Sequence, residues 1–126
     1  ASRSAIFIVK GPKMTGLKAR GLNVENVDIP ISPNSVFSEV IAKKNYYRGP
    51  LLKIPPNEPL IAVLSGNPQD CLIIPIQIRD KIIGLLYADN GNASVMDASL
   101  TYINTLVTLA SYSFEIVILR KKIMDL

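Results

Sequence analysis

The side chains that most often carry enzyme chemistry are almost absent from this sequence. It contains no histidine and a single cysteine, Cys71. Histidine is the commonest general base and metal ligand, so a zinc site, a Ser-His-Asp triad and a Cys-His nucleophile are excluded. No cation adjoins Cys71 in the sequence to activate its thiol. We therefore expect no catalytic residue, no metal site and no bound cofactor.

The best candidates for ligand binding are Tyr46, Tyr47 and Arg48, at the end of a predicted helix. Together they offer a stacking ring, a hydroxyl and a cationic fork, which suit an anionic or aromatic effector. We expect Arg20, on a facing strand, to complete this pocket. The competing interpretation is that the two tyrosines close the edge of a core.

Asp89 and Asn90 form a second polar pair, at the end of an apolar run. They could bind a metal or a ligand. Aspartate and asparagine also end strands and cap turns, and we favour that role here.

Composition indicates one soluble globular domain over residues 1–126, since 48% of the residues are hydrophobic and 19% are charged. The formal net charge is +4, but the basic residues are scattered without interleaved aromatics, which argues against nucleic-acid binding. A lone cysteine fits a reducing compartment, so we expect a cytoplasmic location. The sequence has no initiator Met, which suggests a domain excised from a longer protein with a neighbouring domain.

A membrane span is also not expected. The apolar stretch at residues 100–119 carries a stripe of polar side chains at helical spacing, which a lipid-facing helix would not have.

The pattern of apolar residues and turn signals predicts the following elements. Strands are expected at residues 4–10, 15–20 and 51–54, with a short extended piece at 27–31. A helix is expected to begin at Ser32-Pro33 and to fade near Asn45. Residues 55–59 and 65–68 are predicted to be loops, with a helical turn or two at 60–64 between them.

The clearest feature is a β-hairpin near the middle of the chain. Residues 71–79 alternate in polarity, Asp80-Lys81 supplies a reversal, and residues 82–88 return as an apolar run. Because that run is apolar on both faces, it should lie centrally in a sheet covered on both sides.

A long helix is predicted to close the chain, with one apolar seam from Met96 to Val117. A second, late seam contains Ile116, Leu119 and Ile123. A helix with two apolar sides needs two neighbours: its own sheet and, we expect, a second copy of the chain. The alternative is that a missing N-terminal helix covers the late seam.

The hairpin resembles the closing hairpin of GAF domains. Its proline Pro75, the charged turn 79–81, Gly84 and Asp89 occupy the places where that family shows such residues. The resemblance implies an α+β fold with a central antiparallel sheet of about five strands flanked by helices, and a long C-terminal helix. It also implies a small-molecule pocket on one side of the sheet and a helical dimer layer on the other.

The departures from the family pattern narrow the function. The helix that normally precedes the first strand is missing. Because the sequence has no histidine, we expect neither the covalent bilin attachment nor the haem ligation known in this family, and one cysteine cannot form the disulfide of the family's methionine sulfoxide reductases. The sequence thus favours a non-catalytic, homodimeric signalling module with or without a small effector. The alternatives are a small-molecule sensor at Tyr46, Tyr47 and Arg48, or a longin or roadblock-type interaction domain.

Overall fold

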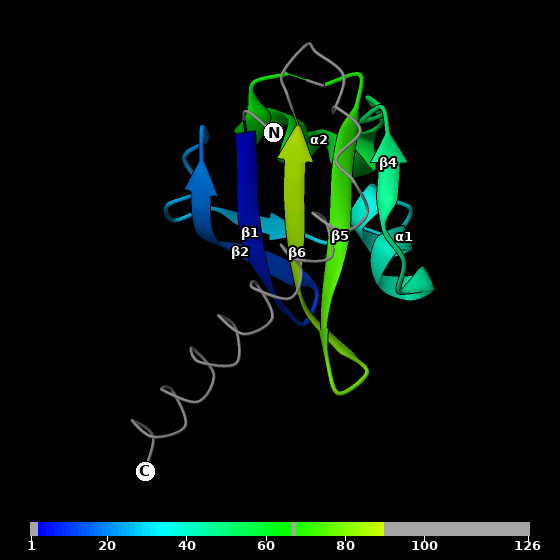
Figure 1. The fold of residues 1–126 in the computed structure, drawn as a ribbon. Helices are drawn as coiled ribbons and strands as arrows, with labels where there is room; N and C mark the ends of the chain where they lie inside the picture. Colours follow the sequence, from blue (N-terminus) through cyan, green and yellow to red (C-terminus); the bar gives the residue numbers. More distant parts are fainter. Residues whose placement is uncertain (1–2, 67, 90–126) are drawn as a thin grey trace.

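The computed structural model describes residues 3–66 and 68–89, which form an antiparallel sheet with helices on one face (Figure 1). The sheet has six strands in the order β3-β2-β1-β6-β5-β4, which confirms the predicted antiparallel sheet. Its elements, in chain order, are β1 (Arg3–Lys10), β2 (Lys13–Arg20), β3 (Asp28–Pro30), α1 (Val36–Lys43), β4 (Tyr47–Gly49), the 3-10 helix η1 (Pro55–Asn57), α2 (Glu58–Leu64), β5 (Cys71–Ile78) and β6 (Lys81–Asp89).

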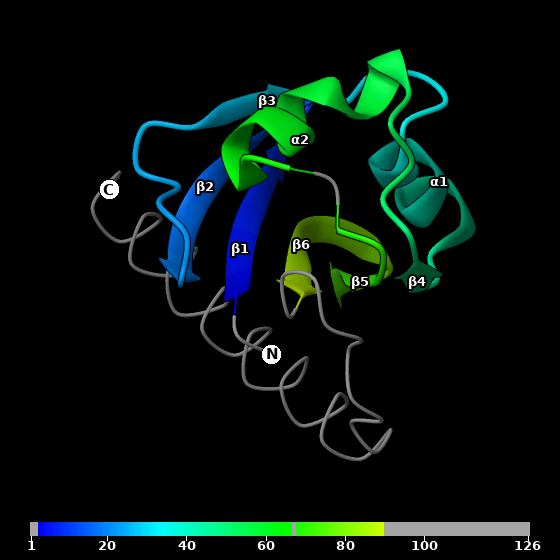
Figure 2. The ribbon, with the colours of Figure 1, turned by 90° about the horizontal axis from the view of Figure 1, so that it is seen from above.

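Apolar side chains form two clusters, one on each face of the sheet. The inner cluster joins strand residues such as Phe7 and Tyr87 to Phe37 of α1 and Leu60 of α2. Viewed from above, both helices lie on this inner side (Figure 2). The outer cluster contains Leu72, Ile74, Ile76 and Leu86, and every member described is a residue of the sheet. The two-faced apolarity predicted for the β6 run is thus confirmed.

The central hairpin β5–β6 is also confirmed, with a shift of one residue in its turn. Ile78 pairs with Lys81, so the turn residues are Arg79 and Asp80 rather than Asp80 and Lys81. Both have positive φ, at 52° and 65°, which is the backbone hand that matches the twist of a two-residue hairpin.

Helix α1 begins at Val36, later than predicted. Asn34 has a φ of 65° and places a turn where the helix was expected, in which the Ser35 N–H donates to the Ser32 carbonyl at 3.1 Å. The helix cap is therefore Ser35, whose hydroxyl accepts the Ser38 N–H at 3.2 Å. The side chain of Asn57 accepts the Val36 N–H at 2.9 Å, so η1 also contributes to this cap.

Two other predictions in this region are wrong. Residues 51–54 are not a strand: Pro50 has no N–H to continue the ladder, and the Leu51 N–H donates instead to the Pro68 carbonyl at 3.0 Å. Their place at the sheet edge is taken by β4, which pairs with the start of β5. Residues 55–59 form η1 and the first turn of α2 rather than a loop, since Pro59 stands where a helix tolerates proline.

The predicted C-terminal helix and its late seam lie outside the described residues. Among the helices described, none is long and apolar enough to cross a membrane.

Gly16 in β2 is a point of close approach between the sheet and the segment that follows it. A Cβ at this position would lie 2.3 Å from the Val24 carbonyl oxygen and 2.6 Å from the Val24 Cβ. The Gly16 N–H donates to the Val27 carbonyl at 2.9 Å, which holds the segment in place. Position 16 therefore requires glycine because there is no room for a side chain beside Val24.

We expect Gly16→Ala to lower the free energy of unfolding by about 2 kcal/mol, because the added methyl overpacks against backbone. Urea denaturation would measure this, with the exposed Lys18→Ala on the same strand as the control. Equal stability of the two variants would show that residues 22–27 can move aside without cost.

Candidate functional site

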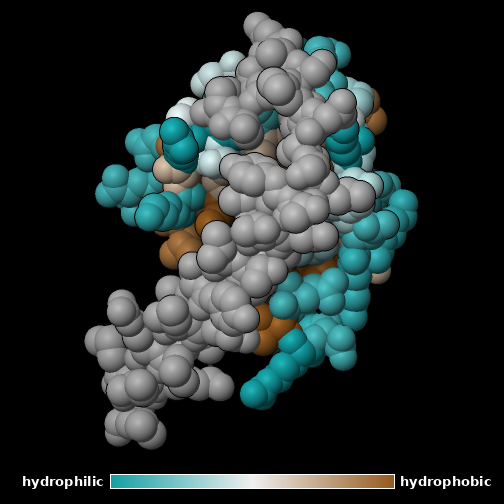
Figure 3. Space-filling model, viewed as in Figure 1, coloured by the Kyte–Doolittle hydropathy of each residue, from teal (hydrophilic) through white to brown (hydrophobic). Residues whose placement is uncertain are grey.

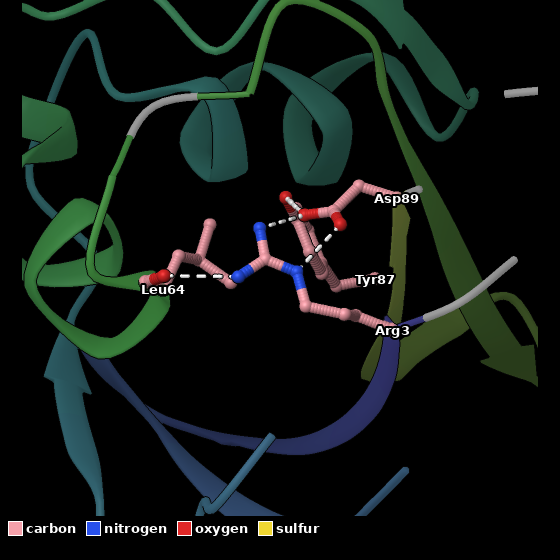
Figure 4. Close-up of polar contacts among 4 residues, drawn as sticks. All are labelled: Arg3, Leu64, Tyr87 and Asp89. Carbon is pink, nitrogen blue, oxygen red and sulfur yellow. Dashed lines mark hydrogen bonds and ion pairs between the residues drawn. The ribbon is translucent and has the colours of Figure 1, made fainter. Parts of the chain in front are cut away.

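A buried ionic cluster joins the start of β1 to the end of β6 (Figure 4). Arg3 donates two hydrogen bonds to the Asp89 carboxylate, from Nε to Oδ1 at 2.7 Å and from Nη2 to Oδ2 at 2.9 Å. The hydroxyl of Tyr87 donates to the same carboxylate. Asp89 has no solvent exposure, whereas the Arg3 side chain keeps 23% of its surface accessible. This is a two-pronged charge-assisted interaction at the rim of the core.

Strand register explains why these residues meet. Arg3 pairs directly with Asp89, and Asp89 pairs with Cys71 on its other side. Directly paired residues in an antiparallel sheet point to the same face, so all three side chains lie on the face that α1 and α2 cover. Tyr87 reaches the same face because it is two residues from Asp89 along β6.

The cluster also includes the end of α2. The remaining nitrogen of the guanidinium, Nη1, donates to the Leu64 carbonyl at 3.0 Å. Leu64 is the last residue of α2, and Ser65 closes the helix in the left-handed conformation. Carbonyls at a helix C-terminus lack helical partners and favour a cation, so Arg3 satisfies the helix and the carboxylate together.

Burial makes the neighbouring acids unreactive. Desolvation, followed by the nearby Asp89 charge, raises the pKa of the Cys71 thiol from its usual 9.0 to about 12. Desolvation and the hydrogen bond to Asp89 likewise raise the pKa of Tyr87 well above its usual range. The hydrogen bond to Asp89 is also the main reason that the pKa of Arg3 is raised. At neutral pH the cluster holds one ion pair, a neutral phenol and a neutral thiol. Such a set of groups stabilises the fold and offers no activated acid or nucleophile.

Sequence reasoning missed the role of Asp89 and did not consider Arg3. Asp89 does end β6, as expected, but its side chain points into the protein and is paired there. The available signal was an aspartate closing a run that is apolar on both faces, because such a carboxylate needs a buried cation. Its partner could not be read from the sequence, since 86 positions separate Arg3 from Asp89.

Tyr46, Tyr47 and Arg48 are adjacent in the chain but point in different directions. Tyr47 packs against the inner cluster, and its hydroxyl donates to the Pro50 carbonyl. Arg48 pairs with Leu72 in the ladder, which places it on the outer face, and its guanidinium lies 3.5 Å from the Asp70 carboxylate. Tyr46 is 54% exposed. The structure thus gives Tyr47 the edge-of-core role that was the competing interpretation.

Arg20 lies far from these residues. It ends β2, whereas Tyr47 and Arg48 are on β4, and the strands β1, β6 and β5 lie between them. At about 4.8 Å between neighbouring strands, the two backbones are roughly 19 Å apart. Arg20 pairs with Ser4, whose row continues through Ala88 and Leu72 to Arg48, so it also belongs to the outer face.

Metal-ligating side chains do not gather in the described part of the chain: no group of three or more Asp, Glu, Cys or His residues could hold an ion there.

No protein-family model and no curated protein matches the sequence. Solved structures do match. Residues 122 to 287 of a methyl-accepting chemotaxis protein superpose with a TM-score of 0.76 and 20% identity, over 95% of this chain and 81% of that one. The GAF domain of a phosphoenolpyruvate-protein phosphotransferase from Acinetobacter gives a TM-score of 0.70 at 15% identity, over 100% and 76% of the two chains.

A free methionine-R-sulfoxide reductase from Thermoplasma acidophilum shares the fold more distantly, with a TM-score of 0.60 and 15% identity over 86% of this chain and 72% of that one. These likenesses establish the fold: the chain is a GAF-like α+β domain, rather than the longin or roadblock type. The fold alone does not determine the function, because it occurs in both a chemotaxis protein and a reductase.

Replacing Arg3 should be among the most damaging changes available in the described residues. Arg3→Ala leaves the Asp89 carboxylate buried without its cation, and we expect a loss of about 3 kcal/mol in the free energy of unfolding. Arg3→Lys should lose less, because one of the paired bonds survives. Chemical denaturation would test this against Lys10→Ala, an exposed change on the same strand. Equal effects of the alanine variants would refute a stabilising ion pair.

The thiol of Cys71 should be protected in the folded protein. With a pKa of about 12 rather than 9.0, its reactive thiolate is about a thousandfold rarer at pH 8. Labelling with a thiol reagent should therefore be slow in buffer and fast in denaturant. Rapid labelling of the native protein would contradict the buried site.

The same shift predicts a pH dependence of stability. The folded protein holds the thiol proton more tightly than the unfolded chain, so this contribution is complete below pH 9.0 and is lost as the pH rises toward about 12. Stability measured across that range should fall less steeply in Cys71→Ala than in the original protein. Parallel curves for the two proteins would contradict the shift.

Proposed function

We propose that this chain is a non-catalytic regulatory module that pairs with a second copy through its C-terminal segment. The observation that carries the proposal is the two-sided apolarity of the sheet. The described helices supply the layer on the inner face, while the described members of the outer cluster around Ile76 are all strand residues. A sheet that is apolar on both faces requires a layer on each.

The segment at residues 100–126 has the sequence to supply the outer layer. Its first seam, which includes Val107 and Phe114, fits a helix packed against the outer cluster. The late seam of Ile116, Leu119 and Ile123 is then available for the same helix of a second copy. In this proposal a shift in the packing of the paired helices passes a signal to a neighbouring domain.

The proposal that the module is non-catalytic is supported by the state of its chemistry-bearing groups. Cys71 is buried and its thiol is held neutral, and Tyr87 and Arg3 are occupied by Asp89. The chemotaxis protein among the structural matches has a signalling role by its description, which agrees with a regulatory use of the fold. A cytoplasmic location belongs to the same proposal.

A small effector has less support. The Tyr47 hydroxyl and the Arg48 guanidinium both have partners within the protein, and Arg20 is on a distant strand. The inner face, where a pocket was expected, is occupied by Phe7, Phe37 and Tyr87, each only 1% exposed. Native mass spectrometry of the purified chain would report any co-purified small molecule together with the number of subunits.

Pairing is tested by changing the late seam. We expect the original chain to be a dimer by analytical ultracentrifugation and Leu119→Glu/Ile123→Glu to be a monomer, because buried carboxylates oppose an apolar interface. The matched control is Asn104→Glu/Ser111→Glu, which adds the same charge to the polar stripe of the predicted helix and should remain dimeric. A monomeric original chain at high concentration would overturn the proposal.

A further inference from the structure

Three turns bring most of the net charge of the protein to one end. Lys10 and Lys13 flank the β1–β2 turn, Arg79 and Lys81 belong to the β5–β6 turn, and Lys43 and Lys44 end α1. All six side chains are exposed. We call this set the basic end. Figure 3 shows hydrophilic surface around the turn of the β5–β6 hairpin, which carries part of the basic end.

The strand register places these turns beside one another. Lys10 pairs with Lys13 across the β1–β2 hairpin. Strand β1 also pairs with β6, and Ile8 lies opposite Gly84. Because the two strands are antiparallel, Lys10 at the end of β1 and Lys81 at the start of β6 lie at the same end of the sheet. Neighbouring strands lie about 4.8 Å apart, so the backbones that carry Lys10, Lys13 and Lys81 are close together.

A hydrogen bond joins α1 to the β5–β6 turn. The Lys44 ammonium donates to the Asp80 carbonyl at 3.0 Å, so the end of α1 lies against the β5–β6 turn. The end of α1 and the two hairpin turns therefore present their cations from the same end of the domain.

The charge at this end is unbalanced. Among the described residues, three acidic ones accompany the six cations: Asp80 in the turn, Glu39 one helical turn before Lys43, and Asp28, whose carboxylate lies 3.7 Å from the Lys13 ammonium. The basic end thus has a formal charge of +3, out of +4 for the whole chain. Such a concentration of one sign steers and orients an oppositely charged partner.

We propose that the basic end is a docking surface for an acidic segment of a partner protein. Its residues are different from those of the late seam, so separate variants test this proposal and the proposed pairing. Cations gathered at one end of the domain complement carboxylates repeated along one side of a peptide.

Two observations favour a protein over a membrane or a nucleic acid. Asp28 and Asp80 sit among the cations, and their charges would be repelled by the phosphates of either alternative but can pair with a basic residue of a protein. Of the large exposed apolar side chains described, which could enter a bilayer, Tyr46 alone follows closely on one of these turns, two residues after Lys44, and three are elsewhere: Leu17, Leu52 and Ile54.

The test measures binding of a fluorescent polyglutamate peptide to the full chain by anisotropy. The Lys10→Glu/Lys81→Glu variant reverses two charges of the basic end, and we expect it to bind about tenfold more weakly. Its matched control is Lys18→Glu/Lys53→Glu, which makes the same change in net charge at exposed lysines elsewhere and should bind like the original chain. Binding should also weaken as salt is added.

Each other outcome overturns the proposal. Equal losses in the two variants would mean that only net charge matters, and no binding to the original chain would remove the surface. Tighter binding to phosphatidylserine vesicles or to polyuridylate than to the peptide, lost in the basic-end variant, would assign the surface to a membrane or a nucleic acid. If the glutamate variants unfold, Lys10→Gln/Lys81→Gln and Lys18→Gln/Lys53→Gln make the same comparison.

Discussion

The carboxylate of Asp89 brings a negative charge into the interior of the protein, and several elements are arranged around it. A buried charge is tolerated only when a counter-ion and hydrogen bonds replace the water it has lost. Arg3 supplies the charge, and Tyr87 supplies a hydrogen bond. Because Arg3 also binds the last carbonyl of α2, one guanidinium joins β1, β6 and the helix that covers them.

This arrangement determines what its neighbours can do. Cys71, opposite Asp89 in the ladder, is buried beside a negative charge, so its thiol stays protonated. Cys71 and Tyr87 could act as a nucleophile or an acid in an exposed cleft, but here they are buried and contribute to stability. That is why we argue for a regulatory role, although the same fold is also found in a reductase.

The division of the sheet into two apolar faces bears on function in a different way. The inner face is closed by α1 and α2 with tightly packed aromatic and aliphatic side chains. The outer face carries a smaller apolar cluster, whose described members come from the strands. The tightly packed inner face thus gives less support to a pocket between sheet and helices than the apolar outer face gives to a covering layer.

Local patterns in the sequence determined the elements whose signals are short-range. The β5–β6 hairpin follows from alternation and a charged turn, and strand β1 follows from an apolar, β-branched run that ends at Gly11-Pro12. Tertiary structure decided everything that depends on partners distant in the chain. Asn57 shares the cap of α1, and Leu51 bonds to Pro68 instead of extending a strand. Likewise three strands separate Arg20 from Arg48, and Arg3 lies opposite Asp89. Strand order and register determine which side chains share a face, and neither can be read from local spacing in the sequence.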